Sequence, residues 1–201
     1  MSTLLRKVNP YMQLDSLVSQ GLAYVGDNLG TLTTERLLLL IGQYIDSIEY
    51  SLENRFESNL INTVGLSAIA LNSYDESIDM DDFDADGIYK LLVNNESNFN
   101  LYMANVTTIE NRTFQNCDDV DTSVLQIACA IGKAAADYWN TQIANPETSP
   151  WEDYLPPSFS YVYPNAAIRG ALLFHSKGAG LIGVLAAVLT FSCYEMVKGS
   201  L

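Results

Sequence analysis

The chain has 201 residues and a net charge of −14, with 24 acidic against 10 Lys and Arg residues. This length suits a single domain with a real apolar core. The negative charge disfavours nucleic acid, whose binding depends on Lys and Arg at phosphates, and also disfavours anionic bilayers. Three scattered cysteines without a CxxC pair exclude a disulfide scaffold and a zinc site of that type.

Helical periodicity dominates the first third of the chain. Apolar residues recur at a spacing near 3.6 over 14–29 and 34–54, and a third pattern of this kind covers 57–72. Thr33 and Thr34 precede the second helix, and Gly30 follows the first as a stop signal. We expect these three segments to be helices.

Asparagine-rich sequence weakens the pattern between 94 and 120, since Asn favours turns. The sequence predicts a short helix at 88–92, another near 99–110, and a loop after it. Ser123 and Gln126 form a capping box for a long helix that Pro146 ends. An extended, aromatic-rich connection should follow over 146–164, and then helices at 165–176 and 178–197.

The end of the chain carries no charge from Gly178 to Tyr194. Ala179, Gly183 and Ala187 recur four residues apart, which lets another helix backbone approach closely. A run of seventeen residues is short for a membrane span, so a buried helix is the preferred interpretation, and membrane insertion through 178–194 is the alternative.

These patterns predict an all-α bundle in which the small-residue C-terminal helix packs on or into the rest. The chain divides into an acidic helical domain (1–145), a Pro- and aromatic-rich connection (146–164) and a Gly/Ala-rich helical element (165–201). We expect this last element to belong to the same domain as the first.

An acidic segment offers the best candidate metal site. Asp82, Asp84, Asp86 and Gly87 match positions 1, 3, 5 and 6 of a calcium loop. Position 12 is Val93 and not the usual bidentate Glu, so calcium binding would be weak. The alternative is a solvated loop in which Asp86 caps the next helix.

The remaining polar residues indicate no catalytic motif. The lone His175 suits a helix end, and no nucleophile elbow, phosphate loop or zinc spacing occurs. We therefore predict no catalytic residues and no cofactor other than weak calcium. The aromatic residues of 138–163 suit loop packing, with stacking on a sugar or gripping a peptide as the alternative.

Two ends of the chain resemble a known group of proteins. Asn9-Pro10-Tyr11, the segment 21–25, Tyr138-Trp139, Trp151 and the Gly/Ala-rich end are similar to an uncharacterised, often exported Bacteroidetes family. Ser19 and Gln20 stand where that family has His-Asn. The resemblance implies a helical body and an exported or cell-surface location, and without it a cytoplasmic location is expected; it implies no activity.

Three functions follow from these observations. The first is a non-enzymatic interaction or structural protein that binds an unknown partner or itself, and does not bind nucleic acid. The second is a membrane-anchored or pore-forming protein that uses the C-terminal helices. A hydrolase with Asp and Glu chemistry in the acidic helices is the third.

Overall fold

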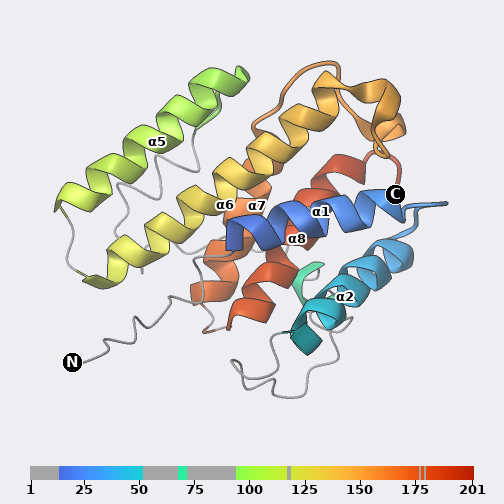
Figure 1. Cartoon of the computed structure of the whole chain (residues 1–201), viewed down its shortest axis with the longest axis horizontal. Coiled ribbons are helices and arrows are strands. Elements are labelled where there is room, and N and C mark those ends of the chain that lie inside the picture. The colour runs from blue at the N-terminus through green and yellow to red at the C-terminus, as the bar shows by residue number, and fades with distance from the viewer. Residues whose placement is uncertain (1–13, 52–67, 72–93, 117–118, 177, 179) are drawn as a thin grey trace, which may run out of the picture.

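The computed structural model describes residues 14–51, 68–71, 94–116, 119–176, 178 and 180–201, and this part of the chain is helical, with no strand (Figure 1). Its elements are α1 (Leu14–Asp27), α2 (Thr34–Ser51), α5 (Phe99–Asn116), α6 (Asp119–Ala144), the short 3-10 helices η2 (Pro146–Thr148) and η3 (Glu152–Tyr154), α7 (Val162–Ser176) and α8 (Leu181–Val197). The predicted all-α bundle is confirmed.

Local signals explain how α1 and α2 are joined. Gly30 has a φ of 57°, a left-handed conformation that glycine adopts at little cost, and it separates the two helices. The Thr33 hydroxyl then accepts a hydrogen bond of 3.1 Å from the Arg36 backbone N–H, which caps the start of α2. Both helices were predicted from periodicity, and α1 ends two residues earlier than expected.

Two predicted boundaries in the middle of the chain are wrong. Helix α5 continues to Asn116, where a loop was predicted, because packing on α6 outweighs the turn preference of asparagine. Helix α6 begins at Asp119, so Ser123 lies inside the helix and is not its N-terminal cap. The predicted helix at 88–92 lies outside the described residues, as does most of 57–72; only 68–71 is described there, and it is helical.

The connection after α6 is more ordered than a fully extended segment. It contains η2 and η3, and α7 begins at Val162, three residues before the predicted start. Pro164 lies in the first turn of α7, where a helix does not need the missing N–H. The segment still contains non-helical residues at 155–160.

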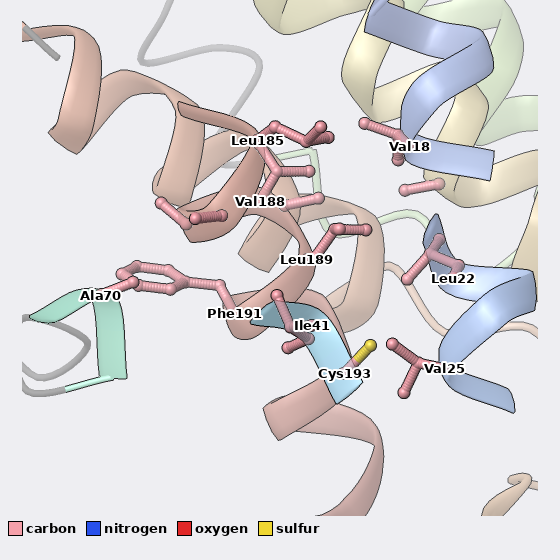
Figure 2. Close-up of a cluster of buried hydrophobic side chains, with 14 of the residues drawn as sticks. Val18, Leu22, Val25, Ile41, Ala70, Leu185, Val188, Leu189, Phe191 and Cys193 are labelled. Carbon is pink, nitrogen blue, oxygen red and sulfur yellow. The ribbon is translucent and has the colours of Figure 1, made fainter. Parts of the chain in front are cut away.

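Helix α8 lies at the centre of the main core. It packs against α7, α1 and α2, and its only intermediate positions in burial are Ile182, Tyr194 and Glu195. Figure 2 shows Leu185, Leu189 and Cys193 of α8 facing α1, while Phe191 points toward Ala70. A helix that is apolar on every side needs such complete burial. The predicted packing of the C-terminal helix into the bundle is therefore confirmed.

A second apolar cluster lies beneath α5. It joins Tyr102 and Val106 of α5 to residues of α6 and α7, and Phe159 of the connection packs against Tyr102. Figure 1 shows α5 at the edge of the molecule, alongside α6. The helical body thus has one large core and one smaller satellite core.

Candidate functional site

The predicted calcium ligands cannot be placed. Asp82, Asp84 and Asp86 lie outside the described residues. Within the described part, no three His, Cys, Asp or Glu side chains converge in a way that could hold a metal ion. Weak calcium binding by the acidic segment stays a prediction from the sequence.

The aromatic residues around the connection point inward. Trp139 and Trp151 are both fully buried, and their rings meet edge to face with centroids 5.0 Å apart. Tyr163 lies 5.8 Å from Trp139 on another side. Edge-to-face contacts of this kind add stability beyond the area they bury. The two tryptophans therefore pack the connection onto the bundle, as the preferred interpretation of the sequence predicted.

The polar atoms of this aromatic group are used to join helices. The Trp151 indole N–H donates to the Tyr138 hydroxyl oxygen at 2.7 Å, and that hydroxyl donates to the Leu22 carbonyl oxygen at 3.1 Å. Burial raises the pKa of Tyr138 well above its usual value. This hydrogen-bond chain fixes α1, α6 and the connection to one another and keeps the phenol neutral.

A parallel chain reaches α8. The Trp139 indole N–H donates to the Ser192 hydroxyl oxygen at 2.8 Å, and Ser192 donates to the Tyr163 carbonyl oxygen at 3.1 Å. Ser192 is completely buried, so its hydroxyl needs both partners. By contrast, Thr190 Oγ1 is buried without a hydrogen-bond partner, and it is the only such side-chain atom among the described residues.

A polar network that the sequence did not predict lies between α5 and α7. The Tyr102 hydroxyl donates to Asn165 Oδ1 at 3.0 Å, and Asn105 Nδ2 donates to Asn94 Oδ1 at 3.2 Å. Burial raises the pKa of Tyr102 far above its usual value. The sequence placed Asn94 in a turn-favouring segment and Asn165 at the start of a helix. It predicted a buried role for neither residue, because these roles depend on contacts distant along the chain.

The cysteines whose positions are described are buried free thiols. Burial raises the pKa of Cys129 to about 12 and raises the pKa of Cys193 further. Since the thiolate is the nucleophilic form, neither thiol is activated in the folded protein. These two cysteines belong to the cores and not to a reactive site.

His175 lies half-buried at the end of α7, as the sequence suggested. It borders a shallow hollow of about 10 Å³ together with Ile127, Ala128, Ala171 and Leu172. This volume holds roughly one water molecule. The hollow is too small for an organic ligand.

The small residues of the last two helices form a close contact, although its position differs in part from the predicted one. A Cβ added at Gly170 of α7 would lie 2.7 Å from the Ala187 carbonyl oxygen of α8. Gly183 and Ala187 are buried, and Ala179 lies outside the described residues. Gly170 was missed because its partner helix cannot be identified from spacing within one helix.

The described helices include none with both the length and the apolar character needed to cross a membrane. Comparisons with known proteins add no relative, since no family model, curated protein or solved structure matches the chain.

Proposed function

We propose that this chain is a non-enzymatic helical protein that acts by binding a partner or a second copy through its exterior. The charge distribution of the described surface supports this proposal more than any other observation. The exposed acidic residues are Asp15, Asp27, Glu35, Asp46, Asp137, Glu147, Glu152 and Asp153.

Basic groups on the same described surface offset little of this charge. Arg36, Lys133 and Arg169 are only partly exposed, and Lys133 forms an ion pair of 2.6 Å with Glu110. The exposed Lys198 forms another ion pair of 2.6 Å with Glu195. A surface of this kind attracts cationic groups at long range and repels phosphates. It favours a positively charged protein partner over nucleic acid.

The interior supports the non-enzymatic part of the proposal. The buried hydroxyl and indole groups of Tyr102, Tyr138, Trp139, Trp151 and Ser192 are all occupied in hydrogen bonds between elements. Such bonds fix the helices relative to one another. These five side chains therefore have a structural role, and Thr190 Oγ1 is the one buried side-chain polar atom of the described residues that has no hydrogen-bond partner.

A lysine-rich peptide tests the proposal because it supplies a cationic probe without a fold of its own. Calorimetry at low and moderate salt should give saturable binding that weakens as salt rises. Asp27→Asn, Glu152→Gln and Asp153→Asn together neutralise one end of the bundle, where Trp151 contacts Gly26.

The matched control neutralises three other exposed acids, through Asp15→Asn, Glu35→Gln and Asp46→Asn. Unequal losses of affinity from the two triple variants would support a defined binding surface. Equal losses would show only general attraction of opposite charges, and absence of saturable binding would contradict a cationic partner.

A membrane-active role is the second candidate, and the composition of α8 favours it. This helix is apolar on every side, a property shared by central core helices and membrane segments. Its close contact with α7 through Gly170 and Ala187 would also suit a helical hairpin in lipid. Release of that hairpin from the bundle would have to precede insertion.

Flotation of the full chain with neutral phosphatidylcholine vesicles tests this candidate. Protein that rises with the vesicles, with Trp139 and Trp151 accessible to a lipid-borne quencher, would support insertion. Protein that stays at the bottom of the gradient at pH 7 and at pH 5 would contradict it.

A further inference from the structure

The described side chains of helix α5 take no part in the main core. The buried residues of that core come from α1, α2, α6, α7 and α8, together with Leu29, Ala70 and Trp151. The α5 residues 99–111 have described side chains, and the buried ones among them, Tyr102 and Val106, belong to the satellite core. None of these described α5 side chains contributes to the main core, so loss of their contacts would leave the packing of the main core in place.

The attachment of α5 is also limited in strength. Its ion pair to α6 joins Glu110 and Lys133, whose side chains remain 21% and 29% exposed and are therefore partly screened by water. Its buried polar tie to α7 is the hydrogen bond from Tyr102 to Asn165. The outer face of α5 carries Asn, Thr and Ala together with Leu101, which is 54% exposed.

We propose that α5 is a cover that opens away from α6 and α7 while the main core stays folded. Proteins open in cooperative units of unequal stability, and a helix held by a small separate cluster belongs to the less stable units. Most of the stability of a helix in a protein comes from packing of its apolar face, so α5 can also lose its helical structure once detached.

Opening would uncover a continuous apolar surface on α6 and α7. Its fully buried or nearly fully buried members are Ala128, Cys129, Ala136, Ile168 and Leu172. An apolar surface of this kind is a common feature of interaction sites when it is exposed. The movement of α5 would thus control when that surface meets solvent. This inference does not depend on the proposed function, because it concerns movement and not partner binding.

The chain contains two natural reporters for the test. Cys129 lies beneath α5, with its Sγ atom 3.9 Å from the Val106 carbonyl oxygen, whereas Cys193 lies in the main core. Both side chains are 0% exposed, so a thiol reagent reaches either of them only after an opening. Burial also raises the pKa of both thiols, which suppresses their reactivity until that opening.

The experiment measures labelling of these two thiols by an aromatic disulfide in the full chain, with Cys117→Ser as background. Rates at pH 8 are divided by those of the urea-unfolded chain, and peptide masses locate the label. We expect Cys129 to react at least about tenfold faster than Cys193, with a weaker dependence on added urea, because local opening exposes less surface. Equal rates with equal urea dependence would overturn the proposal, as would faster labelling of Cys193.

Two matched variants sharpen the result. Glu110→Gln removes the ion pair to Lys133 and should accelerate labelling of Cys129 several-fold while leaving Cys193 unchanged. Glu35→Gln makes the same chemical change in the first turn of α2. It should leave the labelling rates of Cys129 and Cys193, each relative to the urea-unfolded chain, unchanged. A Glu110→Gln protein whose two cysteines accelerate equally, or not at all, would show that α5 does not open separately.

Discussion

Gly170 of α7 lies directly against the backbone of Ala187 of α8. A Cβ built on Gly170 would be 2.7 Å from the Ala187 carbonyl oxygen and 3.1 Å from the Val188 nitrogen. Backbone atoms cannot move aside as flexible side chains can. The absence of a side chain at Gly170 therefore sets how closely the two most buried helices approach.

Gly170→Ala should lower stability clearly, since the added methyl must push α7 and α8 apart. Overpacking of this type typically costs about 1–3 kcal/mol. Gly199→Ala is the control, because a Cβ at Gly199 meets nothing within 4 Å. Urea unfolding followed by circular dichroism compares the two variants. Equal stability of Gly170→Ala and the parent would mean that the helices are not in close contact there.

Ser192 and Thr190 provide a matched pair of buried hydroxyls on α8. Ser192→Ala removes the acceptor of the Trp139 indole N–H, and leaving such a donor unsatisfied costs roughly 1–3 kcal/mol. Thr190→Val replaces a buried hydroxyl that has no partner with a group of nearly the same shape. It should leave stability unchanged or raise it.

Thermal unfolding of both variants checks this contrast. Ser192→Ala is expected to melt below the parent and Thr190→Val at or above it. The opposite order would indicate that Thr190 has a hydrogen bond in solution and that Ser192 does not connect Trp139 to Tyr163.

Elements with strong periodicity could be predicted from the sequence, whereas contacts between distant helices could not. The apolar spacing in α1 and α2 and the uncharged run in α8 are local properties, so their helices were expected. The long extent of α5 was not expected, because single-residue turn preferences do not include the stabilisation from packing on α6.

The same limit applies to the interior polar groups. Tyr102 and Asn165 are 63 residues apart in the chain, and their hydrogen bond depends on how α5 and α7 are placed. Trp139 and Ser192 are 53 residues apart. Nothing in local spacing identifies such partners. The acidic segment with Asp82, a local motif, could be interpreted as a calcium loop from the sequence alone, and that interpretation stays a prediction.

Alkaline pH should destabilise the fold through its buried thiols and phenols. Burial raises the pKa of Cys129 from 9.0 to about 12 and that of Tyr44 from 10.0 to about 12. Because the folded-state pKa values are the higher ones, the neutral groups contribute full stability below pH 9. That contribution falls as pH rises from about 9 to 12, since the unfolded chain ionises first.

The urea midpoint of unfolding, measured between pH 7 and pH 11, would show the decline in stability. Tyrosinate absorbance would show whether ionisation of the phenols accompanies it. Ionisation of Tyr44, Tyr102 and Tyr138 should accompany unfolding and not precede it, because burial raises the pKa of each of these phenols. Complete titration of all 12 tyrosines in the folded protein near pH 10 would contradict the burial of Tyr44 and Tyr102 and the partial burial of Tyr138.

The contact between Gly26 and Trp151 gives an optical test of how the connection is anchored. A Cβ at Gly26 would lie 2.5 Å from Trp151 Nε1, the atom that donates to the Tyr138 hydroxyl oxygen. Gly26→Ala should therefore displace the indole and break that hydrogen bond. Overpacking of this type typically costs about 1–3 kcal/mol, and loss of the hydrogen bond adds about 1 kcal/mol.

Fluorescence separates this displacement from a general loss of stability. Both tryptophans are fully buried in the parent, so its emission should be blue-shifted and poorly quenched by acrylamide. In Gly26→Ala the emission should move to longer wavelength, and quenching should increase at temperatures where the far-ultraviolet spectrum is still that of the parent. Gly180→Ala is the control, because its Cβ meets nothing within 4 Å and its φ of −70° suits alanine. An unchanged emission spectrum in Gly26→Ala would mean that Trp151 does not pack against Gly26 of α1. The connection would then be held to the bundle by other contacts.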